Sequence, residues 1–562
     1  MDGGRQQQLM AEDLKKEIKR NALVRRAKTR MRITRRSRVD VDETEDPDPG
    51  LRLSSPGRDA DRTTVHELIT PAATPPNPTQ TTFSGRQTNS GRPNQDVGVG
   101  PSPEGISAEQ NDFERGLLMS YLDYAFPVLF PFYKPSILEG GRAWLLTLAM
   151  RYPAFYHNVI GLAACFYCAV PILPGLEHDA CVVKAQTELH SQMEKAVRGV
   201  QDSLKDVTQK GVDYSLAENV RLLGNIVQLV NFEVVFASSE NWHMHLDAAV
   251  ELFLQTIKHH GEGYRDVPLM RMMLEKLRGD VPSNCSIWSS EQAALRFFTA
   301  MVVYQDILAS TARERASTLI GHYDGILSPT SDTNQTTLLD LEDFIGCQNW
   351  ILRSIAEITA LTEWKRTAKQ TGFLDIMDLV RRGTPIQDNL RSGTARLQQS
   401  ASSPRSQPPV SPYQPLETIL ARSYINNGLT ASQLVDRSVV SRIWAHAAQV
   451  YLITVLSGWQ PLNIQLRSHV AQALDLLSTI DNPSWLRTLA WPFCVTGCFA
   501  TKEQETAFRN VANASGGLAM FGTVRDALAI TEKVWSLRDH FDADAWDIAF
   551  CLRILGHSVL LV

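Results

Sequence analysis

The first 164 residues of this 562-residue chain contain no cysteine, and all eight cysteines lie further along. That part of the chain therefore cannot bind zinc through thiolates. The eight cysteines are widely spaced and most lie in apolar segments, which excludes the dense disulfide framework of a small secreted domain. We expect reduced cysteines that pack as small hydrophobic side chains, in an intracellular compartment.

A signal peptide and a membrane-spanning run are also lacking. The first residues, MDGGRQQQLM, contain no hydrophobic segment of the kind that directs secretion. The longest apolar run, VIGLAACFYCAVPIL, is interrupted by Pro171 and is too short to cross a bilayer, which needs about 20 residues. We therefore expect no membrane contact and interpret this run as a buried helix.

Common catalytic motifs are missing as well: the chain has no G-x-x-x-x-G-K-[ST], no H-E-x-x-H and no G-x-S-x-G. We predict that it is not an enzyme and that it needs no cofactor. The sequence closest to a metal site is NWHMHLDAAVE, followed by KHH at Lys258, His259 and His260. On a helix its His243 and His245 point to different faces, although His243–Asp247 and Asp247–Glu251 have i,i+4 spacing. We favour a structural role, with one histidine half-buried and the others in water, and predict no metal site.

Two cysteine pairs have spacings that redox or metal sites use. Cys165 and Cys168 have no positive charge near them in sequence to lower a thiol pKa. Cys494 and Cys498 share a helical face, but the nearby sequence offers no histidine or further cysteine as a ligand. We interpret both pairs as core packing.

Positive charge is concentrated at the start of the chain. Residues 1–38 hold thirteen basic and four acidic residues, which gives a local net charge of +9. Because the net charge of the whole chain is −5, the remaining residues carry a net charge of −14. The densest part contains eight basic side chains and no acid: Arg25, Arg26, Lys28, Arg30, Arg32, Arg35, Arg36 and Arg38. Six acids follow within residues 39–50. An arm of this kind can bind polyanions, whereas the acidic remainder repels them.

We favour a nuclear import signal for these eight residues, which can also contact DNA phosphates. An import receptor and the DNA backbone are thus the expected partners of the arm. A simple solvated tail is one alternative. A mitochondrial presequence is another, and its acidic residues argue against it: Asp2, Glu12, Asp13 and Glu17.

The remaining chain is expected to be all-α, with one large helical region interrupted by an insert. Residues 1–46 form the basic arm, and the Pro/Ser/Thr-rich composition of 47–107 predicts a disordered linker. Helical periodicity predicts ordered parts over 108–380 and 416–562, separated by a disordered insert over 381–415. No run of alternating β-branched residues predicts a strand.

Several local predictions follow the same periodicity. Apolar residues recur every three or four positions from Cys181 to Val207, which predicts one long amphipathic helix. An exposed stripe on it would favour partner binding. Prolines in FPVLFPFYKPS (126–136) predict an extended crossover, and residues 543–560 are predicted as a helix. In the insert, Ser403-Pro404 and Ser411-Pro412 are candidate phosphorylation sites.

The ordered blocks resemble the fungal-specific transcription factor domain, the helical regulatory region of fungal zinc-cluster proteins. LLMSYLDYAFPVLFPFYKPSILEGGRAWLLTLAMRYPAFYHNVIGLAACF is similar to its opening. A W-x-x-H-L-x-A-A helix follows at Trp242. The C-terminal blocks of the family domain are resembled by four further segments: IWAHAAQVYLITVLSGWQPLN, LRTLAWPFCVTGCFA, EQETAFR and WDIAFCLRILGHSVLLV. The resemblance covers residues 108–562 outside the insert.

This resemblance implies a nuclear regulator of RNA polymerase II transcription, with transcriptional co-regulators or a homodimer as partners. Family members read bases through an N-terminal six-cysteine zinc cluster, but this chain has no cysteine before Cys165. Either an N-terminal segment is missing from the sequence, or this member lacks the zinc cluster. Two alternatives remain open: a partner protein that does not read DNA, and a helical domain that senses a metabolite.

Overall fold

A computed structural model describes residues 108–135, 139–170, 179–236, 241–261, 267–279, 288–328, 338–402, 437–520, 522–540 and 546–562. Within these ranges the chain is helical and has no β-strand, only an isolated bridge between Leu327 and Leu339. The predicted all-α class is confirmed. The basic arm, the linker and residues 403–415 of the insert lie outside the described residues.

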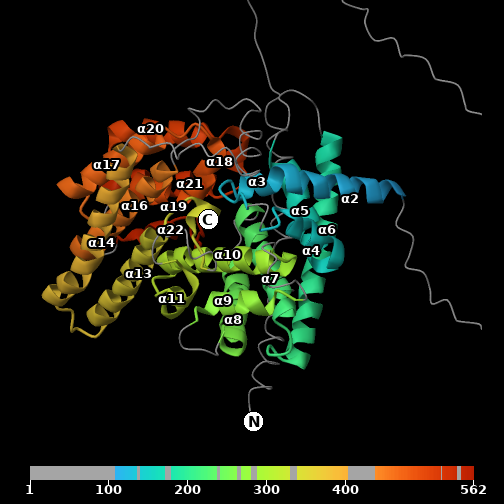
Figure 1. Cartoon of the computed structure of the whole chain (residues 1–562). Coiled ribbons are helices and arrows are strands. Elements are labelled where there is room, and N and C mark those ends of the chain that lie inside the picture. The colour runs from blue at the N-terminus through green and yellow to red at the C-terminus, as the bar shows by residue number, and fades with distance from the viewer. Residues whose placement is uncertain are drawn as a thin grey trace, which may run out of the picture. The chain divides into compact units, whose positions relative to one another are not determined.

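The first part of the body consists of ten α-helices: α2 (Ala108–Ser120), α3 (Phe126–Leu129), α4 (Ala143–Arg151), α5 (Pro153–Ala169), α6 (Asp179–Lys210), α7 (Leu216–Phe236), α8 (Trp242–Thr256), α9 (Leu269–Lys276), α10 (Ser290–Arg313) and α11 (Tyr323–Ile326). Figure 1 shows the second part beside it: α12 (Glu342–Ile345), α13 (Asn349–Gln370), α14 (Ile376–Ser402), α16 (Ser438–Ser457), α17 (Ile464–Leu477), α18 (Pro483–Thr488), α19 (Ala490–Gly497), α20 (Lys502–Asn513), α21 (Val524–Ser536) and α22 (Ile548–Leu552).

Helix α10 is the central element of the first part. Every residue from Gln292 to Ala312 is buried, because α4, α7, α8, α13 and α22 all pack around the helix. Its start is fixed by a capping box, in which Ser289 and Gln292 each bond the other's backbone N–H. The Trp491 indole donates to the Thr311 hydroxyl at 3.0 Å and so ties the second part to this helix.

Helix α16 is the corresponding core helix of the second part. It is the one helix in the described part of the chain that is long and apolar enough to span a bilayer, but most of it is buried inside the body. Its Trp444 ring stacks on Trp491 with centroids 5.5 Å apart and planes 8° apart. Because each indole buries a large apolar surface, this stacked pair stabilises the core of the second part.

The long amphipathic helix predicted over 181–207 is present as α6. Its apolar stripe is mostly covered: Ala185, Leu189 and Ala196 are buried where α6 packs along α5. The two backbones approach closely, since a Cβ added at Gly199 would lie 2.6 Å from that of Ala154. The stripe therefore stabilises the body, and the exposed stripe that would have favoured partner binding is not found on most of this helix.

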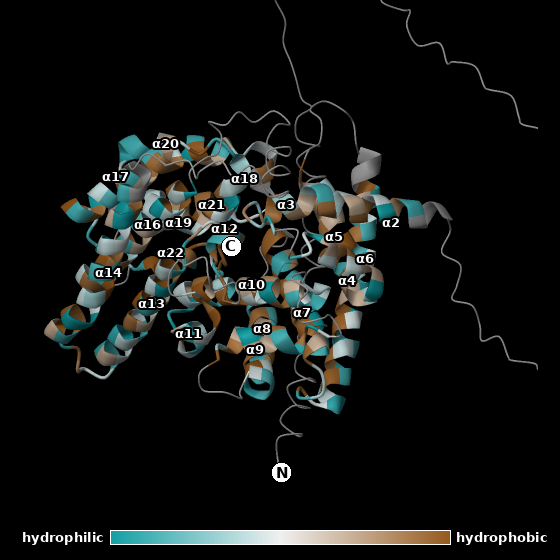
Figure 2. Ribbon diagram, in the orientation of Figure 1, coloured by the Kyte–Doolittle hydropathy of each residue, from teal (hydrophilic) through white to brown (hydrophobic). Residues whose placement is uncertain are grey.

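The predicted start of the disordered insert is wrong, because residues 381–402 form most of helix α14. The Gly, Pro, Ser and Gln content favoured disorder, yet Leu379, Ile386, Leu390 and Leu397 share one buried face. Glycines on that face let neighbouring helices approach. A Cβ at Gly393, for example, would lie 2.4 Å from the Trp350 ring. Figure 2 shows the resulting alternation of hydrophobic and hydrophilic residues around α13 and α14.

The helix predicted over 543–560 is also mostly wrong. Within the described residues 546–560 of that range α22 is short, the chain beyond it is irregular, and its last residues, 559–562, are buried. Its backbone accepts hydrogen bonds from other elements: Trp242 Nε1 donates to the Ser558 carbonyl at 3.1 Å and Thr523 Oγ1 to that of Val562 at 3.2 Å. These tertiary bonds replace those of a helix, and the C-terminus lies at the centre of Figure 1.

Part of the extended crossover predicted from the prolines is helical instead. Pro127 lies at the start of α3, which follows directly on the π-helical turn Tyr121–Ala125, so the helix continues through this proline. The chain becomes non-helical from Phe130. Phe126, Phe130 and Tyr133 then pack around Phe297 of α10, with centroids 4.9 to 5.5 Å from its ring.

Candidate functional site

The eight basic residues predicted for import or phosphate contact lie outside the described residues: Arg25, Arg26, Lys28, Arg30, Arg32, Arg35, Arg36 and Arg38. Their role stays a prediction. The other candidate residues lie in the helical body, where the structure shows their contacts. The body also contains two surface features that sequence reasoning did not identify.

The histidine-rich segment is occupied by ordinary structural contacts. Asp247, the acid with ligand spacing, accepts from Arg313 at 2.6 Å and from Arg315 at 2.9 Å. His243 is exposed, His245 half-buried, and buried His260 contacts the Val212 carbonyl at 2.9 Å. Nowhere in the described ranges do three or more His, Cys, Asp or Glu side chains group so that they could hold a metal ion.

Three cysteines of the two pairs, Cys165, Cys494 and Cys498, lie in the core, and Cys168 is half-buried. Burial raises the pKa of both Cys165 and Cys168, which makes them poor nucleophiles. Cys551 of α22, distant in sequence, joins Cys494 and Cys498. Burial raises the pKa of Cys494 and Cys551, so both remain thiols that donate to Cys498. Sequence spacing could not reveal this third cysteine, because only the tertiary fold brings α22 next to Cys494 and Cys498.

A histidine pair, buried His446 and half-buried His469, links α16 and α17. The Nδ1 atoms of His446 and His469 lie 3.1 Å apart. Burial, followed by the nearby His469 and Arg442, lowers the pKa of His446 to about 3, and burial with Arg391 lowers that of His469. Both rings are therefore neutral at physiological pH.

The turn between α13 and α14 exposes large apolar side chains. They are Phe373, just before α14, and Ile376, Met377 and Val380 in its first turns, which are 84%, 57%, 74% and 45% exposed. We call these four residues the α14 patch. The two helices reach the periphery of the body together in Figure 1. Single exposed apolar residues are common, but several large ones so near one another in the chain are typical of a protein-contact surface.

A cavity of about 280 Å³ lies where α17, α18 and α20 meet. Its walls are largely apolar, and its lining consists of Leu477, Ser478, Ile480, Asp481, Pro483, Leu486, Ala507, Asn510, Val511, Ala514 and Ser515. The α20 wall is formed by residues 507, 510, 511 and 514, which share one helical face. Because two of these four residues are alanines, the helix does not fill the space in front of it.

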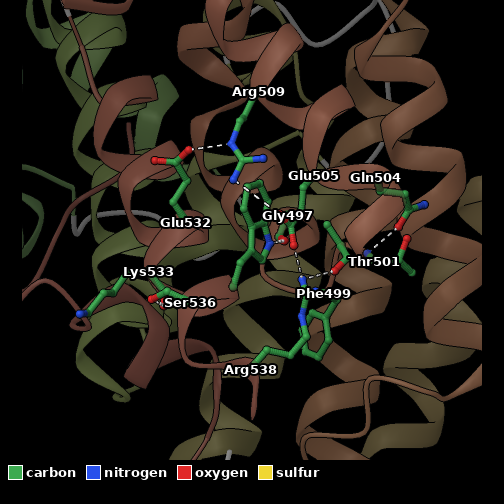
Figure 3. A network of polar contacts seen from close by, with 12 residues as sticks. Gly497, Phe499, Thr501, Gln504, Glu505, Arg509, Glu532, Lys533, Ser536 and Arg538 are labelled. Carbon is green, nitrogen blue, oxygen red and sulfur yellow. Dashed lines mark hydrogen bonds and ion pairs between the residues drawn. The ribbon is translucent and has the colours of Figure 1, made fainter. Parts of the chain in front are cut away.

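The opposite face of α20 is held by a polar network that Figure 3 shows from close by. Arg509 donates to Glu532 of α21 at 2.9 Å and lies over the Trp535 ring. Glu505 pairs with Arg538 at 3.0 Å, as the close-up shows. The helix start is fixed by a capping box at Thr501. This anchoring keeps the cavity wall in place whether or not the cavity is filled.

Ser515, at the end of that wall, is 5% exposed, and its hydroxyl makes no hydrogen bond. Such a buried, unsatisfied hydroxyl costs about 1–3 kcal/mol unless a partner arrives. The sequence signal for this site was the small-residue stripe of α20. It could not be recognised alone, because the facing wall comes from residues 477–486.

Helix α18 connects the cavity to the first part of the body. Leu486 faces the cavity, whereas the neighbouring Trp485 ring lies 4.7 Å from Phe132. Arg487 is 6% exposed and donates to the Leu129 carbonyl at 2.8 Å, at the end of α3. One short helix thus contacts both the cavity and α3.

Comparison with known proteins gives a consistent result. The fungal specific transcription factor domain matches residues 116–562. The transcription factor dibT of Pestalotiopsis microspora is 35% identical over 100% of this chain and 93% of its own length. Pestheic acid cluster transcriptional regulator 3 of Pestalotiopsis fici is 25% identical over 77% of this chain and 72% of its own.

A third relative, the trichothecene biosynthesis transcription regulator TRI10 of Trichoderma arundinaceum, is 25% identical over 76% of this chain and 92% of its own length. No solved structure matches the chain. The domain match covers most of the chain, and the relative at 35% identity spans all of it. The resemblance found in the sequence is therefore confirmed, and the chain belongs to the fungal specific transcription factor domain family.

Proposed function

We propose that this chain is a nuclear regulator of RNA polymerase II transcription that controls genes of a fungal biosynthetic cluster. The observation that carries the proposal is the domain match over residues 116–562. The names of relatives such as the pestheic acid and trichothecene regulators support a biosynthetic cluster as the set of target genes.

The charge distribution supports a division of labour within the chain. The +9 arm contacts DNA phosphates and the import receptor, while the −14 remainder is repelled by DNA. Phosphate contacts position a protein but do not select a sequence. Residues 1–164 contain no cysteine, so these residues supply phosphate contacts and not zinc-cluster base recognition.

Nuclear localisation and promoter binding test this proposal directly. The tagged full chain is compared in its fungal host with a variant in which the eight arm residues are replaced by Gln. We expect nuclear fluorescence and promoter enrichment in chromatin immunoprecipitation for the original chain, and loss of both for the variant. A matched control replaces exposed Arg198 and Lys205 of α6 by Gln. Cytoplasmic fluorescence of the unmodified chain would refute the proposal.

The α14 patch favours a second candidate function, in which the chain acts through protein contacts with co-regulators or a second copy of itself. The test combines Phe373→Ser with Met377→Ser, whose exposure predicts little change in stability. We expect the pair to reduce reporter transcription, or to convert a dimer to a monomer in sedimentation velocity. Leu462→Ser with Ile464→Ser, equally exposed elsewhere, is the control. Unchanged transcription and unchanged sedimentation would exclude the patch as a contact surface.

A further inference from the structure

We infer that the cavity between α17, α18 and α20 is a binding site for an uncharged, mainly apolar small molecule that carries a hydroxyl group. This site is separate from the arm and from the α14 patch. Whether a small molecule binds this site is therefore independent of the outcome of the localisation and promoter experiments.

The size and the walls of the cavity define the ligand class. A volume of about 280 Å³ lies just below the roughly 300–1,000 Å³ typical of ligand pockets, which limits the ligand to a small molecule. Leucine, isoleucine, valine, proline and alanine side chains form most of the lining. Transfer of an apolar molecule from water to such walls is favourable at about 25 cal/mol per Å² buried.

The charges around the cavity exclude an anionic ligand. The lining contains no lysine, arginine or histidine, and its only ionisable residue is Asp481 at the exposed rim. A carboxylate or phosphate group would thus lose its hydration without a counter-charge and would be repelled by Asp481. A neutral ligand avoids both costs.

The unpartnered hydroxyl of Ser515 explains why the ligand should itself carry a hydroxyl. Ser515 Oγ can both donate and accept, and rotation about χ1 moves it between staggered positions. The Asn510 side chain, exposed on the same lining, offers a second donor and acceptor. A ligand hydroxyl bound here would satisfy a group that the protein leaves without a hydrogen bond.

The geometry also suits a site that must remain open when empty. The polar network on the far side of α20 fixes that wall, and Asn463 and Asn482 cap the starts of α17 and α18 through their side chains. The ligand would contact Leu486 of α18, the helix that also reaches α3 through Arg487.

Isothermal titration calorimetry on the full chain tests the inference, with 2-naphthol as the probe and 2-naphthoate as its charged analogue. We expect saturable binding of 2-naphthol with a dissociation constant below about 1 mM. We expect 2-naphthoate to bind at least about tenfold more weakly, because its carboxylate finds no cation. Absence of saturable binding of 2-naphthol up to about 1 mM would overturn the inference, as would equal affinity for both probes.

Two variants locate the probe in this cavity. Ala507→Phe fills the space and should weaken 2-naphthol binding by at least about tenfold, whereas Ala248→Phe on the exposed surface of α8 should not. Ser515→Ala should weaken it about three- to tenfold through the lost hydrogen bond, with Ser536→Ala as control. Circular dichroism confirms that each variant is folded. Undiminished binding to folded Ala507→Phe would place the probe elsewhere and contradict the proposed site.

Discussion

His446 is a side chain whose protonation state the fold restricts. It lies on α16 and is 2% exposed. The charged or titratable groups that act on it are His469 of α17 and Arg442 of its own helix, and Arg391 of α14 acts in turn on His469. None of these groups carries a negative charge, so nothing stabilises a protonated imidazole there. The ring must remain neutral for the three helices to pack.

We predict that His446 destabilises the body as the pH falls. Its pKa is about 3 in the folded chain and about 6.5 when unfolded, so between these values the unfolded chain binds more protons. The contribution is fully present above pH 6.5 and is lost as the pH falls toward 3. At pH 4.5 the loss amounts to about 2–3 kcal/mol.

Urea unfolding of the original chain and of His446→Gln at pH 7.5 and pH 4.5 measures this effect. The variant should lose less stability on acidification than the original chain, since glutamine does not titrate. Parallel loss of stability in both proteins would show that His446 titrates normally in the folded chain.

Close approach between helices depends on particular glycines. A Cβ at Gly224 of α7 would lie 2.3 Å from the ring of Phe298, which is fully buried in α10. We predict that Gly224→Ala lowers the free energy of unfolding by about 1–2 kcal/mol, because overpacking costs more than the gain in helix propensity. Gly116→Ala in α2, where nothing lies within 4 Å, should instead stabilise by up to about 1 kcal/mol. Thermal and urea unfolding measure both, and a stabilised Gly224→Ala would contradict this packing.

Helix α14 can be tested through its proline. Pro385 lies in the helix interior and is exposed, so Pro385→Ala restores an N–H donor and should stabilise the body by about 1–3 kcal/mol. Leu390→Ala on the buried face should cost about 2–5 kcal/mol. If neither substitution changes the urea midpoint, residues 381–402 do not form a packed helix.

The elements that sequence periodicity predicted best are those whose apolar residues repeat over several turns. Periodicity predicts helices over 215–237, 289–313, 438–457 and 502–513, and α7, α10, α16 and α20 lie within two residues of these ranges. Failures occurred where tertiary contacts override local preference: α14 packs through glycines, and the last residues are held by hydrogen bonds from Trp242 and Thr523. The cavity was not predictable, because its two walls are about 30 residues apart in the chain.

The whole chain combines a basic arm with an acidic remainder, which predicts weak and salt-sensitive DNA binding. If the arm contacts about six phosphates, log affinity should fall with a slope near −5 against log salt concentration. The dissociation constant on random duplex DNA should be about 10⁻⁴–10⁻⁶ M at physiological salt. Fluorescence anisotropy over a salt series measures this slope.

The arm variant with eight Gln residues is the comparison for that slope. Its affinity should become nearly independent of salt, because the remaining chain carries net negative charge. An unchanged slope in the variant would place the DNA contacts on the helical body and contradict the division of labour proposed for the chain.

Regulation of a biosynthetic gene cluster by this chain is tested most directly by transcript sequencing after deletion of its gene. The deletion strain is compared with one in which the original gene is restored. We predict that transcripts of one biosynthetic cluster change together on deletion and return on restoration. A transcript profile that does not change, under conditions in which the original strain makes the protein, would contradict this regulatory role.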